Sequence, residues 1–282
     1  MKNEKNYNNP YEIGEALVEI GTAKTKHTFF KMLILAILAG AFIAFAAEGS
    51  NAAVHTIESV GLAKALAGAL FSAGLMFVMI AGGELFTGNT LILTSVLAKK
   101  AKISGMLKNW AVVYIGNFLG SLLIAYLIFI SGQFNFSDGL LGAYTIKTAV
   151  YKINLSFESA FVMGILCNWL VCIAVWMSLA AKDITGKILG IFFTIWLFIT
   201  SGFEHSIANM YYIPAGILAK SNPDFVQKAI TMGVSEEKIA MLNWDKMLIG
   251  NLLPVTLGNI VGGAVFVGVT YWFVYIRKAK QK

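Results

Sequence analysis

The residues of this chain that could do chemistry are few, and they gather in two short segments with the same spacing. Glu84 and Asn89 lie five residues apart, and so do Glu204 and Asn209. The second segment also holds His205, whose imidazole is suited to donating a proton or a hydrogen bond near neutral pH. Both segments interrupt apolar runs, so the pattern indicates one kind of polar site, present twice.

Composition places these segments in a membrane. The 282 residues are 57% hydrophobic and only 13% charged, whereas soluble domains carry about 25% charged residues. The formal charge is +7, but no polar face is left for a basic stripe that could bind nucleic acid, so the excess belongs beside a membrane. We therefore expect that the chain is not a soluble enzyme and has no nucleic-acid partner. We expect membrane lipid to surround it.

The two cysteines and the start of the chain carry weaker signals. Cys167 and Cys172 lie five apart in one apolar run, which favours small buried residues over a disulfide or a metal site. We therefore expect no cofactor. The polar first residues lack the layout of a signal peptide, so we expect them to be retained.

Six apolar runs are long enough to cross a bilayer core of about 30 Å as helices. They cover residues 29–47, 65–98, 110–131, 158–181, 187–219 and 247–276. Before the first run, Asn9-Pro10 predicts a helix start, and Ile13, Leu17 and Ile20 form a stripe that we expect to lie on the membrane surface. The chain is therefore predicted to be an all-α membrane protein with six transmembrane helices.

Basic residues orient the spans. The side that holds both termini has 15 Lys and Arg, and the other side has 7, so the positive-inside rule predicts a multi-pass protein of the cell membrane with cytoplasmic termini. We expect one transmembrane domain over 1–282, divided into a cytoplasmic amphipathic segment, two repeats and a tail (1–28, 29–131, 132–276 and 277–282). Asn222-Pro223 and Ser235-Glu236-Glu237 predict short helices in the long connection 220–246.

The repeat extends beyond the two polar segments. The numbers 204 minus 84 and 209 minus 89 both give 120, and Asn109 and Asn117 recur as Asn251 and Asn259 with the same spacing of eight. Each half holds three spans, an odd number, so the second half should enter the membrane upside down. Such inverted repeats place their site near the bilayer midplane and build it from broken helices. The second and fifth spans are the predicted broken ones.

The polar residues of the breaks have predicted roles. Asn89 and Asn209 should cap the half-helices 91–98 and 211–219, whose positive ends favour anions. Glu84 and Glu204 should brace the breaks by accepting backbone N–H bonds. Thr87 can offer its hydroxyl to a path or merely break the helix.

Two further polar residues lie outside the breaks. Asn168 is either an interhelical hydrogen bond or a pore group. From its position alone, Lys152 is a solvated charge in a loop.

At these residues the sequence resembles the formate/nitrite transporter family. The likeness is carried by Ser201–Met210, by Gly83–Thr87, by Leu166–Ser178 with Asn168, and by Ile249–Gly263. It implies an aquaporin-like protomer in a homopentamer, with one path per protomer for formate, nitrite or hydrosulfide. It also implies the following roles: His205 as central histidine, Thr87 as its partner, Lys152 as the residue that draws anions, Asn168 and Asn209 as amides of the path, and Phe71, Leu75, Leu85 and Phe198 as constrictions.

The function expected from these observations is a channel or transporter for small monovalent anions of weak acids, with formate first and nitrite or hydrosulfide as alternatives. The resemblance does not choose the anion, and it leaves open whether protons accompany it. A neutral-solute channel of the aquaporin kind is a rival, although neither break holds Asn-Pro-Ala. A redox subunit with haem or metal ligands is disfavoured, because one intramembrane histidine has no second histidine on another span.

Overall fold

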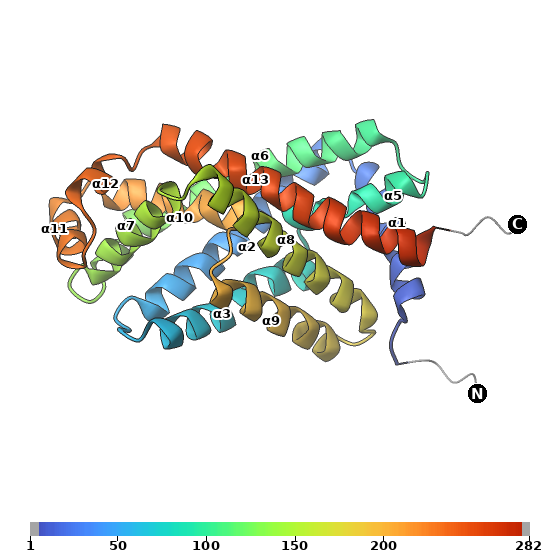
Figure 1. The fold of residues 1–282 in the computed structure, drawn as a ribbon, viewed down its shortest axis with the longest axis horizontal. Helices are drawn as coiled ribbons and strands as arrows, with labels where there is room; N and C mark the ends of the chain where they lie inside the picture. The colour runs from blue at the N-terminus through green and yellow to red at the C-terminus, as the bar shows by residue number, and fades with distance from the viewer. Residues whose placement is uncertain (1–5, 278–282) are drawn as a thin grey trace, which may run out of the picture.

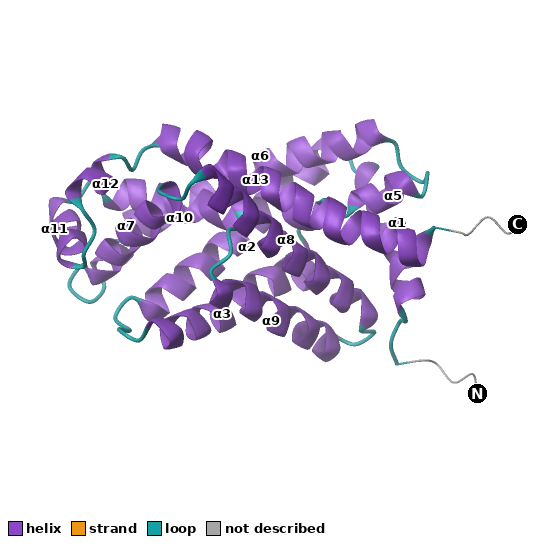
Figure 2. Cartoon of the chain, viewed as in Figure 1, coloured by secondary structure: helices purple, strands orange, loops and turns teal. Residues whose placement is uncertain are grey.

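The computed structural model describes residues 6–277, and the regular secondary structure of this part of the chain is helical, apart from one isolated bridge between Tyr7 and Ala181. Within it, six helices are long and apolar enough to cross a membrane. The predicted number of spans is therefore confirmed. Figures 1 and 2 show the helices as one bundle, with α11 and α12 at one end and α1 at the other. Residues 1–5 and most of the predicted tail 277–282 lie outside the described residues.

The elements follow one another as a chain of helices with short connections. In order they are α1 Pro10–Thr25, α2 Phe29–Val54, α3 Val60–Met76, η1 Phe77–Gly82, α4 Phe86–Asn89, α5 Ile92–Leu97, α6 Ile103–Ile130, η2 Gln133–Asn135, α7 Leu140–Ile153, α8 Phe157–Ala180, α9 Ile184–Ser201, α10 Ser206–Ala219, α11 Pro223–Thr231, α12 Glu236–Ala240, η3 Lys246–Leu252, α13 Leu253–Ile260, η4 Val261–Val269 and η5 Trp272–Ile276.

The first span is longer than predicted, because it runs on to Val54 instead of ending near residue 47. The extra turns contain Glu48, Ser50 and Asn51, which are polar but buried by neighbouring helices to 2–4% exposure. The predicted span ended near residue 47 because these polar residues lower the hydropathy of the sequence. A hydropathy value does not depend on whether protein or lipid surrounds the residue.

The second and fifth apolar runs are both interrupted: the second contains α3, η1, α4 and α5, and the fifth contains α9 and α10. The first of these runs leaves its helix at Gly82, is extended through Leu85, and turns into α4 at Phe86. The other run leaves α9 at Ser201 and starts α10 at Ser206. Gly82 (φ 101°) and Gly202 (φ 75°) adopt the left-handed conformation that side chains disfavour.

Two helix pairs approach closely enough for backbone to meet backbone. A methyl group added at Gly120 of α6 would overlap the carbonyl oxygen of Ile37 in α2, and one added at Gly262 would overlap that of Ile165 in α8. Small residues of this kind let helices pack tightly in a membrane, where apolar surface alone does not drive association.

The N-terminal helix α1 begins as predicted, and most of its apolar stripe packs against the rest of the protein. Asn9 accepts hydrogen bonds from the backbone of Tyr11 and Glu12, with Pro10 in the first turn. Ile13 and Leu17 are buried at 3% and 5% exposure. Two of the three stripe residues therefore pack inside the protein, in one cluster with Leu91 and with residues of α8 and η4, whereas Ile20 is 39% exposed.

The connection 132–157 also differs from expectation. Most of it forms the helix α7, whose buried face packs on α10. The two short helices expected in 220–246 are confirmed as α11 and α12, capped by Asn222 and Ser235.

Candidate functional site

The polar site is centred on a hydrogen bond between the two segments that the sequence analysis singled out. Thr87 lies in α4, and His205 stands immediately before α10. Their atoms Oγ1 and Nε2 lie 2.9 Å apart, and both side chains are buried at 3% exposure or less. The fold therefore brings the predicted central histidine and its predicted partner together.

The other ring nitrogen of His205 fixes the tautomer. Its Nδ1 accepts a hydrogen bond from the backbone N–H of Ala208 at 3.0 Å, so it carries no proton in this arrangement. A neutral imidazole then has its proton on Nε2 and donates to Thr87 Oγ1. A second proton on Nδ1 would face an N–H donor at the positive end of α10, which disfavours the charged ring. His205 is thus a neutral donor, and the Thr87 hydroxyl keeps its own hydrogen to donate.

On the α1 side, a lysine closes a buried polar cluster. Lys24 Nζ donates to Asn89 Oδ1 at 2.7 Å and to Glu84 Oε2 at 3.2 Å. Asn89 Nδ2 in turn donates to Glu84 Oε2 at 2.6 Å and to Asn109 Oδ1 at 2.8 Å. We call Lys24, Glu84, Asn89 and Asn109 the α1-side cluster.

A similar arrangement, without the bond from the lysine to the asparagine, recurs beside α7 among the described residues. Lys152 Nζ donates to Glu204 Oε1 at 2.8 Å. Asn209 Nδ2 donates to Glu204 Oε2 at 2.6 Å and to Asn251 Oδ1 at 2.7 Å. We call these four residues the α7-side cluster. The solvated-loop interpretation of Lys152 is wrong, because the residue is only 9% exposed and pairs with a buried carboxylate.

Lys24 is the main residue that the sequence analysis missed. It lies among other lysines of a polar-looking segment, and 60 residues separate it from Glu84 whereas 52 separate Lys152 from Glu204. Lys24 and Lys152 differ by 128 in number, not by the 120 that relates the two glutamates, so the offset of the polar segments does not mark Lys24.

Two asparagines, and not the glutamates, brace the interrupted backbone. Asn117 accepts from the N–H of Phe86 at 2.9 Å and donates to the carbonyls of Ala36 and Glu84 at 2.8 and 2.9 Å. Asn259 accepts from the N–H of Ser206 at 2.9 Å and donates to the backbone carbonyls of Gly164 and Glu204 at 2.8 and 3.0 Å. These bonds satisfy backbone groups that hydrocarbon could not.

The predicted capping and bracing roles are therefore corrected. His205 caps α10, and the N-cap position of α4, Leu85, makes no side-chain cap bond. Asn89 and Asn209 lie inside α4 and α10 and serve the lysine clusters instead. Among the described residues, the carboxylates of Glu84 and Glu204 accept from side chains, not from backbone N–H groups.

Asn168 makes the interhelical bonds that the sequence analysis offered as one of its two alternatives. Its Nδ2 lies 2.6 Å from the carbonyl of Asn259 and 3.2 Å from that of Thr87. Its Oδ1 is buried without a partner in the described part of the chain, as are Ser206 Oγ and Asn209 Oδ1. Buried polar atoms are normally satisfied, so these three unpaired atoms are unusual in a protein interior. The sequence analysis did not identify Ser206.

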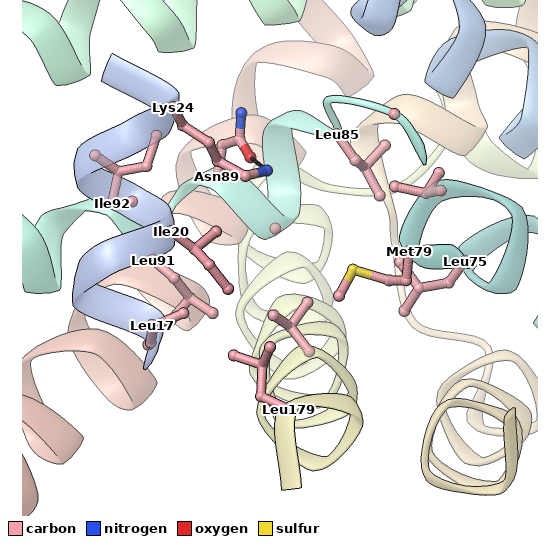
Figure 3. Close-up of a pocket in the computed structure, with 15 residues that line it drawn as sticks. Leu17, Ile20, Lys24, Leu75, Met79, Leu85, Asn89, Leu91, Ile92 and Leu179 are labelled. Atoms are coloured by element: carbon pink, nitrogen blue, oxygen red, sulfur yellow. Dashed lines mark hydrogen bonds between the residues drawn. The ribbon is translucent and has the colours of Figure 1, made fainter. Parts of the chain in front are cut away.

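The four predicted constriction residues are all buried, and two of them border a cavity. The cavity has a volume of about 60 Å³. Figure 3 shows Leu17, Ile20 and Lys24 of α1 on one side of it and Leu75 and Leu85 on the other. Lys24 and Asn89, joined by the dashed line, supply its charged and amide side chains. The helix α1 therefore covers an apolar chamber with one polar corner.

Of the other two constriction residues, Phe198 lies next to His205, and Phe71 packs against Phe198. The rings of Phe71 and Phe198 meet edge to face with centroids 5.8 Å apart, and the Phe198 ring lies 6.1 Å from the imidazole. An apolar ring thus lies beside the Thr87–His205 pair, with a second ring packed behind it.

Metal-binding residues do not gather in the part of the chain that the structure describes. No group there holds three or more His, Cys, Asp or Glu side chains in a metal-binding arrangement. Cys167 and Cys172 are both buried and not joined in a disulfide.

Six apolar spans around a buried polar pair define an integral membrane protein whose site lies inside its helix bundle. The chain belongs to the formate/nitrite transporter family, whose model matches residues 11–273. The family resemblance found in the sequence is thereby confirmed.

Curated relatives and solved structures agree with this assignment. The formate channel FocA of Haemophilus influenzae is 41% identical over 264 residues, which cover 92% of each chain. FocA of Escherichia coli is 36% identical and matches 95% of each chain. A solved pentameric formate channel with formate bound aligns with a TM-score of 0.77 at 38% identity, covering 88% of this chain and 98% of that one. A solved ion channel of the same family aligns with a TM-score of 0.77 at 27% identity, covering 93% of this chain and 98% of that one.

Proposed function

We propose that this protein is a membrane channel or transporter for small monovalent anions of weak acids, with formate as the first candidate. The observation that carries the proposal is the Thr87–His205 pair, buried between apolar constrictions and two lysine clusters. The formate channels among its relatives support formate over nitrite and hydrosulfide.

The two clusters support an inverted repeat with two broken spans. In both clusters the lysine donates to the glutamate, and one asparagine donates to the glutamate and to a second asparagine. Asn117 and Asn259 brace the two breaks alike. We place both termini and the α1-side cluster in the cytoplasm, because Lys and Arg are in excess on that side. The α7-side cluster then faces outward. The pentameric neighbour supports a homopentamer of aquaporin-like protomers with one path in each.

In this mechanism, the anion first gathers at a lysine. Lys152 on the outside and Lys24 on the inside each lie beside a carboxylate, so each mouth is nearly neutral and holds an anion weakly enough to release it. The apolar rings and leucines then strip water from the anion, which is costly for a bare charge. Asn209 and Asn168 supply amide groups along the way.

At the centre, Thr87 offers the compensating hydrogen bond. The backbone N–H of Ala208 donates to His205, His205 donates to Thr87, and the Thr87 hydroxyl is left to donate to the anion. Hydrogen bonds in such a chain strengthen one another, and this one starts at the positive end of α10. In this proposal His205 acts as a hydrogen-bond donor and keeps its proton. Ser206 Oγ, buried without a partner among the described residues, offers a second donor.

Uptake into proteoliposomes tests the proposal. Labelled formate, nitrite and hydrosulfide should enter vesicles that contain the protein and not empty ones, and formate uptake should saturate. Thr87→Val, which removes the hydroxyl at nearly constant volume, should abolish most of the flux, whereas Thr87→Ser should retain it. A Val variant as fast as wild type would refute the central role of Thr87. Glycerol flux without anion flux would favour a neutral-solute channel instead.

A further inference from the structure

One titratable residue distinguishes the two lysine clusters. His27 lies between α1 and α2, and its Nε2 is 4.0 Å from Glu84 Oε1. The same carboxylate accepts from Lys24 through its other oxygen at 3.2 Å. The His27 side chain is 22% exposed, whereas that of Glu84 is only 5% exposed. His27 is therefore in reach of protons from the water on the α1 side.

The α7-side cluster has no histidine in this place. Glu84 N–H donates to the carbonyl of Leu35, and Glu204 N–H donates to that of Met163. Leu35 and Met163 make equivalent bonds, and their residue numbers differ by 128. The same offset makes Leu155 the equivalent of His27 in the second half. Leucine does not titrate. Any effect of the histidine is thus confined to one mouth.

The surroundings of His27 determine when it becomes charged. Burial and the neighbouring Lys31 lower its pKa from 6.5; Glu84 acts in the opposite direction, and Lys24 again lowers the pKa. These are the charged groups that act on the imidazole from α1, from α2 and from the segment after η1. A lowered pKa means that the ring is neutral at neutral pH and takes up its proton only in acid.

We propose that His27 is a proton-sensitive, anion-attracting residue of the inner mouth, without a counterpart at the outer mouth. This inference rests on the proposed function and on the cytoplasmic position of α1. With His27 neutral, Lys24 and Glu84 cancel to no net charge. With His27 protonated, the cluster carries +1, and the imidazolium competes with Lys24 for Glu84. Both effects leave more positive charge facing the cavity that Lys24 borders.

The consequence is a directional response to acid. As the cytoplasm acidifies, the inner mouth should bind a permeant anion more tightly, while the outer mouth should not change by this route. One partly screened charge corresponds to a change of about two- to fivefold in apparent affinity. The response would favour export of the anion when acid accumulates inside.

Sided vesicles from cells that produce the protein can measure this response. Inside-out vesicles present the α1 side, and right-side-out vesicles present the other. The apparent KM for formate would be measured in both between about pH 7.5 and 5.5, where formate stays ionised. His27→Gln removes the charge at every pH, and His27→Lys fixes it. His55→Gln is the matched control, because His55 lies at the far end of α2, where it contacts Ser137. His205 is present in all variants.

For the wild type and His55→Gln, the KM from the α1 side should fall about two- to fivefold with acid. It should stay high in His27→Gln and low in His27→Lys, with the difference between the two reduced by salt. In right-side-out vesicles, all variants should respond alike. A pH response in His27→Gln equal to wild type would overturn the role of His27 while leaving the proposed function intact. Absence of formate flux in the wild type would overturn the proposed function itself.

Discussion

Thr87 Oγ1 and His205 Nε2 form a 2.9 Å hydrogen bond between two interrupted helical segments, although 118 residues separate them in the chain. The imidazole also caps α10 through Nδ1. The His205 ring therefore makes one hydrogen bond to the backbone of α10 and one to Thr87. Mutation can remove the second bond while keeping the first.

We expect His205→Asn to fold and to lose most of its anion flux. Asparagine is a good N-cap residue, so its oxygen can replace Nδ1 at Ala208. Its shorter side chain cannot also donate to Thr87. Losing a hydrogen bond that supports a charged ligand should slow formate flux by about 10- to 100-fold. Proteoliposome uptake and the melting temperature in detergent measure the two effects.

The control is His205→Ala, which removes both tasks and should lower the melting temperature as well as the flux. The explanation fails if Asn and Ala variants are equally unstable, or if the Asn variant transports formate at the wild-type rate.

The buried pair of Lys152 and Glu204 should couple strongly in a double-mutant cycle. Either Glu204→Leu or Lys152→Met leaves one buried charge unpaired, at a cost of about 3 to 5 kcal/mol. The double variant removes both charges, so it should be more stable than either single variant. Glu204→Gln should also destabilise, because its amide group cannot replace the charge opposite Lys152.

Apparent melting temperatures in detergent test this cycle, with Lys228→Met as control. Lys228 pairs with Asp224, but that carboxylate is 60% exposed, so removal should change little. Additive losses at positions 152 and 204 would show that the two charges do not stabilise each other.

Asn259→Ala should destabilise the protein more than most single substitutions. The amide makes three buried bonds to backbone groups, and each buried group left unpaired costs about 1 to 3 kcal/mol. Asn259→Asp should also destabilise, since it keeps the acceptor for Ser206 but loses both donated bonds. Thermal unfolding in detergent provides the measurement.

Asn154→Ala is the matched control, because that amide makes only a local bond to Val150 within its own helix end. We expect a small effect there. Equal melting temperatures for the two alanine variants would contradict a bracing role for Asn259.

The buried contact of Glu48 with Tyr211 provides a further stability test. The Tyr211 hydroxyl donates to Glu48 Oε2, and Oε1 of that carboxyl is buried without a partner in the described chain. Tyr211→Phe should therefore lower the melting temperature, because Glu48 loses a hydrogen bond that nothing replaces. Adding Glu48→Met should restore much of the loss, since two apolar groups can replace a buried polar pair.

Tyr212→Phe is the neighbouring control, because no hydrogen bond of its hydroxyl occurs among the described residues; its ring instead faces Lys152. If Glu48→Met fails to restore stability to the Tyr211→Phe variant, the two side chains act independently.

Local patterns in the sequence were enough for the spans and the central residues. Six apolar runs predicted six helices, and Asn9-Pro10 predicted the start of α1, because hydropathy and capping depend on neighbouring residues. The spacing of Glu84 with Asn89, and of Glu204 with Asn209, marked both polar segments. The family resemblance implied the pairing of Thr87 with His205, and the structure brings them together.

Tertiary packing alone decided which partners those residues have. Lys24 reaches Glu84 across 60 residues, and Asn117 reaches Phe86 across 31. No local pattern encodes such distances. The same limit explains the wrong capping role of Asn209 and the burial of Ile13 and Leu17 against other helices. Buried polar groups take whichever partner the folded chain presents, so only the arrangement of helices identifies His205 as a cap, Asn259 as a brace and Lys152 as a buried charge.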